Sequence, residues 1–176
     1  MAKIYLISDT HWDDFGEIIR YEGRPFKDGE EMNITLIENW NQVVEPDDII
    51  YHLGDFSSNC DVIHNRAILD KLNGHKRLIM GNHDRHLSVK EWIEAGFEEA
   101  YPLPVILNDF FILSHEPCYV SVSSPYANIF GHVHGNPAYK DYSSRSYCVC
   151  VERIGYAPIL LDNVKHKIIQ ECEVNQ

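Results

Sequence analysis

The sequence predicts an α/β protein in which two β-sheets pack against each other and helices cover the outside. In the first half of the chain, apolar runs that are typical of buried strands alternate with segments of helical period. From residue 103 onward, short apolar runs follow one another between turn residues and carry no helical period. Alternating elements followed by a strand-rich region favour a layered α/β architecture.

The first elements are bounded by recognisable signals. Residues 3–8 form an apolar run and predict the first strand, and residues 12–27 predict an irregular polar and aromatic segment that Pro25 closes. Asp28 can cap a helix over residues 30–44, which has an apolar face and ends before Pro46. Residues 48–53 then predict the second strand.

The next three elements repeat the alternation. Residues 61–72 predict a helix with an apolar stripe, which Asn73 and Gly74 end. Residues 76–80 predict the third strand. Residues 89–95 predict a short helix that stops at Gly96.

The second half predicts strands only. The runs lie at residues 103–107, 110–114, 127–130, 146–151 and 167–170. The last two could lie at a sheet edge and mediate dimerisation, so both a monomer and a homodimer are open.

Length and composition indicate one globular domain over residues 1–176. The chain of 176 residues is 44% hydrophobic and shows no repeat, low-complexity tract or linker. The N-terminus lacks the pattern of a signal peptide, and no apolar run approaches the roughly 20 residues of a membrane span.

The cysteines indicate a reducing compartment. Their number is odd, and they are scattered at Cys60, Cys118, Cys148, Cys150 and Cys172. We therefore expect free thiols and a cytoplasmic protein. Cys148 and Cys150 alternate along a predicted strand, which places both thiols on one face and favours a structural role over soft-metal binding.

The charge excludes one class of function. The formal net charge is −12, with 27 acidic and 15 basic residues, so the long-range field repels polyanions. A general nucleic-acid binder would need a basic stripe. A small phosphate ester remains possible, because two divalent ions would add four positive charges where it binds.

Polar residues follow apolar runs at five places. The strings are Asp9-Thr10-His11, Gly54-Asp55, Gly81-Asn82-His83-Asp84, Ser114-His115 and Gly131-His132-Val133-His134. Because strand exits meet at one edge of a sheet, these side chains are expected to converge there. Any one string alone is common by chance, whereas five in succession point to a metal site.

The donor types indicate two ions and suggest which metals they are. Asp9 and His11, two positions apart, can reach one ion, and Asp55 can bridge two ions with its two oxygens. An oxygen and nitrogen donor set without thiolate suits Mn²⁺, Fe, Zn²⁺ or Ni²⁺ and matches Ca²⁺ or an all-oxygen Mg²⁺ site poorly. Two ions about 3.5–4 Å apart can hold a hydroxide and clamp a phosphate for in-line attack.

These strings resemble the signature of the calcineurin-like metallophosphoesterases, which runs D-x-H, G-D, G-N-H-[DE], a lone H and G-H-x-H. Every element occurs in order within residues 3–135. The small single-domain bacterial and phage members are most similar, since they carry a string like Arg24-Pro25-Phe26. Some of them have a further histidine where Asp13 and Asp14 stand, so the substrate contacts of this loop are not carried over.

The resemblance implies a four-layer αββα sandwich of two mixed sheets flanked by helices, with two divalent metal ions. Mn²⁺ is the first expectation, and Fe, Zn²⁺, Ni²⁺ or Mg²⁺ are the alternatives. The resemblance assigns the metal ligands by position. One ion would take Asp9, His11, Asp55 and His134, and the other Asp55, Asn82, His115 and His132.

His83 matches the family's catalytic histidine, and Asp84 matches the carboxylate that orients it. A histidine beside the metals can act as a general acid, and a carboxylate can fix its tautomer. Alternatively, Asp84 only caps the next turn. Arg20, Arg24 and Arg85 could hold phosphate oxygens, although surface arginines are usually only solvated.

Three functions are consistent with these motifs. The leading one is a phosphodiesterase in which a metal-bridging hydroxide attacks and His83 protonates the leaving alkoxide, acting on a small diester or a nucleic-acid end. The second is a phosphomonoesterase acting on nucleotides or phosphoproteins. The third is a non-catalytic interaction scaffold, which the family contains but in which the catalytic histidine is missing.

Overall fold

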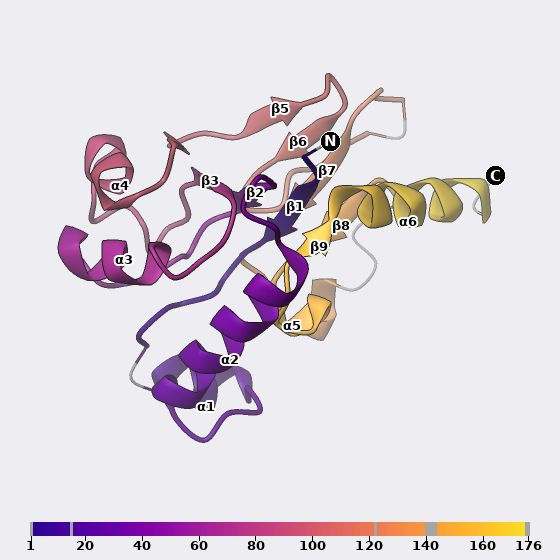
Figure 1. The fold of residues 1–176 in the computed structure, drawn as a ribbon. Helices are drawn as coiled ribbons and strands as arrows, with labels where there is room; N and C mark the ends of the chain where they lie inside the picture. Colours follow the sequence, from indigo (N-terminus) through magenta and orange to yellow (C-terminus); the bar gives the residue numbers. More distant parts are fainter. Residues whose placement is uncertain (1, 15, 122, 140–143, 175–176) are drawn as a thin grey trace.

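Two β-sheets pack face to face at the centre of the structure, a computed structural model that describes residues 2–14, 16–121, 123–139 and 144–174 (Figure 1). The first sheet contains β1 (Ile4–Ile7), β2 (Ile49–His52), β3 (His75–Ile79), β4 (Glu99–Tyr101) and β9 (Ile159–Leu160), in the order β4-β3-β2-β1-β9. β1 to β4 are parallel, and β9 runs antiparallel to β1.

The second sheet has the order β5-β6-β7-β8. Its strands are β5 (Val105–Leu107), β6 (Phe111–Leu113), β7 (Ala127–Phe130) and β8 (Ser146–Cys148). β5 pairs antiparallel with β6, whereas β6, β7 and β8 are parallel. Both sheets are therefore mixed, which confirms the predicted fold class.

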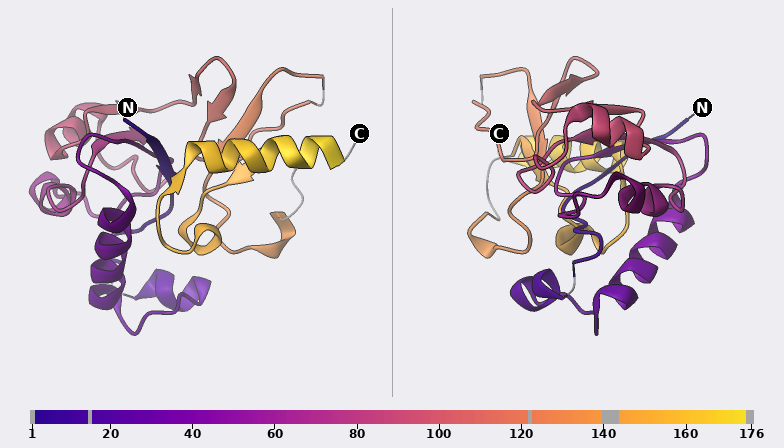
Figure 2. Two further views of the ribbon diagram at one scale, coloured as in Figure 1. Left: turned by 45° about the vertical axis from the view of Figure 1, so that its right-hand side comes forward. Right: turned by 90° about the vertical axis from the view of Figure 1, so that its left-hand side faces the viewer.

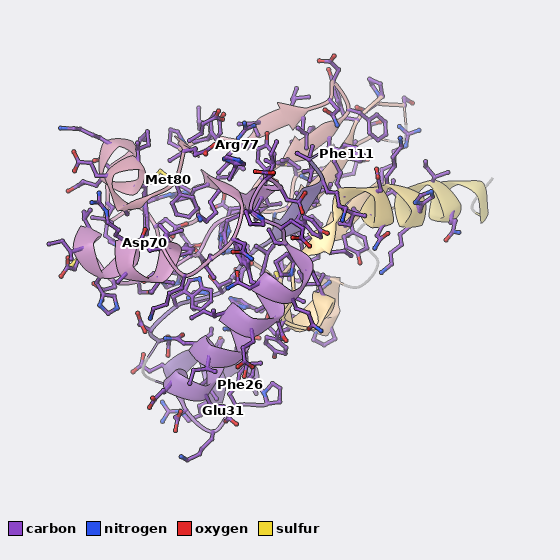
Figure 3. All side chains as sticks on the ribbon, viewed as in Figure 1. Phe26, Glu31, Asp70, Arg77, Met80 and Phe111 are labelled. Atoms are coloured by element: carbon purple, nitrogen blue, oxygen red, sulfur yellow. The ribbon has the colours of Figure 1, made fainter. Side chains whose placement is uncertain are left out.

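The alternation of side chains along β1 separates two hydrophobic clusters. Tyr5 and Ile7 belong to the cluster between the first sheet and its helices, and Leu6 belongs to the cluster between the two sheets. Met80 and Phe111, labelled in Figure 3, belong to the helix-side and inter-sheet clusters respectively. Burial on both faces explains why these strands are continuous apolar runs.

The helices of the first half begin at side-chain caps. Asp28 accepts a hydrogen bond from the Glu31 amide at the start of α2 (Gly29–Val43), and Asp61 caps α3 (Val62–Leu69). Ser88 and Glu91 form a capping box at the start of α4 (Val89–Ala95). All three helices lie close to their predicted positions.

Some elements were not predicted. They are short: α1 (Glu17–Glu22), β4, the 3₁₀ turn η1 (Pro137–Tyr139), α5 (Val151–Ile154) and β9. The predicted strand at 146–151 is also shorter, since β8 ends at Cys148 and Val151 begins α5.

One prediction is wrong, because residues 167–170 lie in the helix α6 (Leu161–Val174) and not in a strand. Leu161, Val164 and Ile168 are buried between the sheets at helical spacing, while Ile169 is 43% exposed. α6 runs along the side of the molecule away from α3 and α4 (Figure 2). A dimer interface built on a strand at 167–170 is therefore excluded.

The two sheets are joined where β1 and β8 end. The Ser8 amide donates to the Val149 carbonyl at 3.0 Å, and the Val151 amide donates to the Ser8 carbonyl at 3.2 Å. The buried thiols of Cys148 and Cys150 lie 3.2 Å apart beside this junction. In the described part of the chain, Cys60 and Cys118 are free thiols as well, and no helix is long and apolar enough to cross a membrane.

Candidate metal centre

All seven candidate metal ligands lie just beyond the carboxyl ends of parallel strands. Asp9 and His11 follow β1, Asp55 follows β2, Asn82 follows β3, His115 follows β6, and His132 and His134 follow β7. Because the sheets join where β1 and β8 end, the strand ends of both sheets meet at one place. The site therefore combines four residues of the first sheet with three of the second.

The first group of donors is Asp9, His11 and His134, whose ligand atoms lie within 4.8 Å of one another. His134 Nε2 lies 3.7 Å from Asp9 Oδ1, and His11 Nε2 lies 3.7 Å from Asp55 Oδ2. His11 Nε2 is buried and has no hydrogen-bond partner among the described residues. A buried donor nitrogen facing two carboxylates, without a partner of its own, fits a metal ligand.

The second group is Asp55, His115 and His132. His115 Nδ1 lies 2.8 Å from the Leu53 carbonyl and donates to it, which leaves Nε2 facing the centre. Asp55 Oδ2 at 3.4 Å, Asn82 Oδ1 at 3.0 Å and His132 Nδ1 at 3.1 Å all approach this nitrogen. Four electron-pair donors facing one point are what a cation needs.

Asp55 lies between the two groups and can serve both. Its Oδ2 faces His11 of the first group and His115 of the second. Its Oδ1 accepts the His83 amide at 2.9 Å, which fixes the orientation of the carboxylate. A shared carboxylate between two sets of donors is the geometry expected of a centre for two ions.

Burial and the pairing of Asp55 with His115 shift the pKa values of the centre. Burial would raise the pKa of Asp55, but the hydrogen bond and charge of His115 lower it below its usual range. Burial would lower the pKa of His115, but the hydrogen bond to Asp55 and the charge of Asp9 raise it to about 9. Burial dominates at His11 and lowers its pKa to about 3, which keeps that imidazole neutral.

The glycines of the motifs make room for this packing. A Cβ on Gly54 would lie 2.5 Å from His115 Nδ1, and one on Gly131 would lie 2.6 Å from Asp9 Oδ2. A Cβ on Gly81 would collide with Asp55 Oδ1. Each glycine therefore lets a backbone segment approach a ligand from another segment.

Most of the candidate ligands have a left-handed backbone, which is uncommon outside glycine. Their φ angles are 59° at Asp9, 50° at His11, 55° at Asp55, 71° at His132 and 48° at His134. Such strain concentrates at functional sites, where the surrounding structure maintains it.

His83 lies beside the centre and faces an open cavity. Its ring centroid is 5.1 Å from that of His11, and its Nδ1 lies 3.4 Å from Ser58 Oγ. The cavity has a volume of about 750 Å³, and its lining includes His11, His83 and His134. A molecule in this cavity could therefore contact His83 together with His11 and His134, two members of the first donor group.

Asp84 contacts the backbone and not the ring of His83. Its buried carboxylate accepts hydrogen bonds from the amides of Asp55 at 2.7 Å, Phe56 at 2.9 Å and Gly81 at 2.8 Å. Burial and the charge of Asp55 raise the pKa of Asp84 to about 6. Instead of orienting the ring of His83, Asp84 connects the loop after β2 to the loop after β3.

The three arginines that were expected to hold phosphate oxygens of a substrate have different surroundings. Arg20 lines the cavity, together with Tyr21 from the same helix. Arg85 is exposed and lies 3.4 Å from Glu116 on the surface. Arg24 is buried, and its guanidinium donates to Glu152 and to backbone carbonyls, so it does not face the cavity.

Two residues that contact His134 were missed in the sequence. Glu152 Oε1 lies 3.0 Å from His134 Nδ1, and Arg153 Nε donates to the His134 carbonyl at 2.6 Å. Both belong to α5, which follows the apolar run at 146–151. The rule that identified the other site residues, a charged or polar residue just after an apolar run, would also have selected Glu152.

Comparison with known proteins identifies a family model and relatives that match most of the chain. The family model described as calcineurin-like phosphoesterase matches residues 2–150. An uncharacterized protein of Methanocaldococcus jannaschii, MJ1445, is 38% identical over 185 residues, covering 99% of this chain and 95% of that protein.

Two further relatives are informative. The gene 66 protein of Mycobacterium phage L5 is 44% identical over 87 residues, which cover 48% of this chain and 41% of the phage protein. The crystal structure of AQ665, a protein of unknown function from Aquifex aeolicus, aligns with a TM-score of 0.73 and 31% identity. That alignment covers 94% of this chain and 99% of AQ665.

Proposed function

Because this chain belongs to the calcineurin-like phosphoesterase family, a family of metal-dependent phosphoester hydrolases, we propose that it is a phosphodiesterase with a two-ion centre. Asp9, His11, Asp55 and His134 would hold one ion, and Asp55, Asn82, His115 and His132 the other. Mn²⁺ is the metal we propose, with Fe, Zn²⁺, Ni²⁺ and Mg²⁺ as alternatives. The oxygen and nitrogen donors, with no thiolate among them, support this choice.

The bound ions would neutralise the phosphoryl oxygens and make a water molecule nucleophilic at neutral pH. The protein itself contributes fixed donor positions. Gly54, Gly81 and Gly131 allow the ligand segments to approach closely, and Asp84 ties two of the segments together. The left-handed ligand backbones add to this preorganisation.

The observation that carries the proposal is the position of His83. Its amide is bonded to the shared ligand Asp55, and its ring lies next to His11 and lines the cavity. A substrate bound in the cavity would bring its leaving oxygen near this imidazole, which would protonate it as the ester bond breaks. A diester has a poor alkoxide leaving group, so this proton matters most for a diester.

Substitution of His83 tests the proposal. We expect His83→Ala to lower kcat for a diester with an alkyl leaving group by about 10²–10⁴, the usual range for a general acid, and to leave two metal ions bound. The loss should be much smaller for bis-p-nitrophenyl phosphate, because p-nitrophenolate leaves without a proton. His86→Ala is the matched control, because His86 is exposed, hydrogen-bonds the Asn59 carbonyl, and is absent from the lining of the cavity. An unchanged rate of His83→Ala on the alkyl diester would contradict the assigned role.

The same assay on p-nitrophenyl phosphate separates the alternatives. Turnover of the monoester alone would replace the diesterase proposal by a monoesterase acting on nucleotides or phosphoproteins. A protein that binds two ions and cleaves neither ester would favour the scaffold. We also propose a cytoplasmic location, which the free thiols of Cys148 and Cys150 support.

A further inference from the structure

The short helix α5 contacts the last ligand segment at both its side chain and its backbone. Glu152 Oε1 lies 3.0 Å from His134 Nδ1. The neighbouring Arg153 donates to the carbonyls of His134 at 2.6 Å and Asn136 at 2.8 Å. Both residues lie beyond residue 150, where the match to the family ends.

Glu152 is itself held by a buried arginine. Arg24 donates to Glu152 Oε1 through Nε at 2.9 Å and Nη2 at 2.6 Å. The same guanidinium donates to the carbonyls of Thr10 at 3.0 Å and Asp9 at 2.7 Å. The side chain of Arg24 is 0% exposed and that of Glu152 is 8% exposed, so the pair is fixed within the protein.

These contacts determine which ring nitrogen of His134 can bind a metal ion. A proton on Nδ1 is shared with the Glu152 carboxylate, so Nε2 keeps its lone pair. Nε2 is the atom that faces Asp9 Oδ1, at 3.7 Å. Arg24 connects the same carboxylate to the backbone of Asp9. Glu152 therefore supports two candidate ligands, Asp9 and His134, that lie far apart in the sequence.

A third metal site is the alternative explanation, because Glu22, His134 and Glu152 also bring donor atoms within 4.8 Å of one another. The contacts of Glu152 argue against it. The oxygen that faces His134 already accepts two N–H groups from a permanent cation, Arg24, so its negative charge is compensated. His134 Nδ1, the ring nitrogen nearest Glu152, donates to the same oxygen and so has no lone pair left for an ion.

We propose that Glu152 is the positioning residue of the first metal site, where it presents His134 Nε2 to the ion and is itself anchored by Arg24. The inference rests on the two-ion centre of the proposed function. It predicts that loss of Glu152 weakens one site and spares the other. Residues that support a ligand in this way typically change metal affinity by 10–100-fold.

Metal titration tests the role without any measurement of turnover. Apo wild type, Glu152→Ala and Glu152→Gln are titrated with Mn²⁺ by calorimetry, and electron paramagnetic resonance records whether the bound ions are coupled. We expect wild type to bind two coupled ions. In Glu152→Ala, we expect one affinity to fall by about 10–100-fold and a spectrum of isolated Mn²⁺ at concentrations that saturate wild type.

Glu98→Gln is the matched control. Glu98 Oε1 lies 2.5 Å from His75 Nδ1, the same contact on an exposed pair outside the metal centre, and its loss should leave both affinities unchanged. Glu152→Gln keeps the size and an acceptor oxygen, so it should lie between wild type and Glu152→Ala. If Glu152→Ala does not fold, Glu152→Gln together with Arg24→Gln removes the charge pair as a unit and decides the question.

Two coupled ions bound with wild-type affinity in a folded Glu152 variant would overturn the proposal, as would equal weakening of both sites. A wild-type protein that binds two ions but cleaves no phosphoester would contradict the proposed function instead. The two failures are therefore distinguishable.

Discussion

At the scale of single residues, the candidate metal ligands coincide with an uncommon backbone conformation. Five of the candidate ligands adopt a left-handed φ, at a cost of roughly 1–2 kcal/mol for each residue with a Cβ. Aspartate and histidine are both among the non-glycine residues that adopt this region most often. The ligand segments therefore store strain that their contacts, and the bound ions, must offset.

Substitutions of His132 can measure the backbone strain separately from the loss of the imidazole ligand. The φ of 71° at His132 suits glycine, so apo His132→Gly should be more stable than apo His132→Ala by about 0.5–1 kcal/mol, once the extra freedom of unfolded glycine is counted. Urea unfolding in the presence of a chelator measures the difference. At His86, which lacks a positive φ, the order should be reversed; alanine being favoured at both sites would disprove the strain argument.

Arg24 and Arg85 carry the same charge in opposite surroundings. Arg24→Met should lower the free energy of unfolding of the apo protein by about 3–5 kcal/mol, because it leaves Glu152 buried without its partner. Arg85→Met should change it by less than about 0.5 kcal/mol, because the Arg85–Glu116 pair is exposed. Denaturant midpoints measure both values, and equal small effects would show that the Arg24 contacts do not stabilise the fold.

At the scale of elements, Asp48 ties the start of β1 to the turn before β2. Its Oδ1 accepts the Lys3 amide at 2.8 Å and its Oδ2 accepts the Glu45 amide at 3.1 Å. Burial would raise the pKa of Asp48, but these two hydrogen bonds lower it below the ordinary value. A lowered pKa means that the ionised form stabilises the folded state.

The lowered pKa of Asp48 determines how the stability of the fold changes with pH. The contribution of Asp48 is complete above its unfolded pKa of about 3.9 and is lost as the pH falls through the lower folded value. Below about pH 4, Asp48→Asn should therefore lose stability less steeply than wild type. Unfolding curves of apo protein from pH 2 to pH 6 test this, with Asp47→Asn as the exposed neighbour that should retain the wild-type slope.

The elements that could be predicted from the sequence are those with strong local signals. β1 and β2 are mostly apolar, β3 ends in the apolar pair Leu78 and Ile79, and α2 to α4 begin at caps. The caps are Asp28, Asp61 and Ser88. α1, α5 and β9 are too short to show a period. The four residues at 167–170 fit a strand by themselves, and only the buried positions from Leu161 onward reveal the helix.

The metal centre was more predictable than the parts that support it. The motif strings follow strands, so topology alone brings the ligands together. The partners of Asp84, Arg24 and Glu152 depend on three-dimensional packing. Arg24 and Glu152 are 128 positions apart, and no local pattern in the sequence connects them.

At the scale of the whole molecule, the metal centre links the two sheets. Its donors come from β1, β2 and β3 on one side and from β6 and β7 on the other. Ions bound by the proposed ligands would connect the two sheets across their interface. Removal of metal should therefore lower the stability of the whole domain and not only that of the ligand loops.

The effect of Mn²⁺ on the free energy of unfolding measures how strongly the ions connect the two sheets. At a free Mn²⁺ concentration about 100 times Kd, each site adds about 2.7 kcal/mol to the free energy of unfolding. Asp55 faces both donor groups, so Asp55→Asn should weaken both proposed sites, and Mn²⁺ should raise the Tm of this variant far less than that of wild type. Thermal scans with Mn²⁺ and with chelator give the comparison; an equal rise in both proteins would show that Asp55 is not shared.

The pairing of β1 with β9 also has a consequence for biosynthesis. β1 leaves the ribosome before its partner strand β9 and before Glu152, which supports His134. A nascent chain can expose Asp9 and His11 while His115, His132 and His134 are still missing. The full set of proposed ligands thus exists only after His134 has been synthesised, so the two-ion centre can fill only once β7 has followed β1 out of the ribosome.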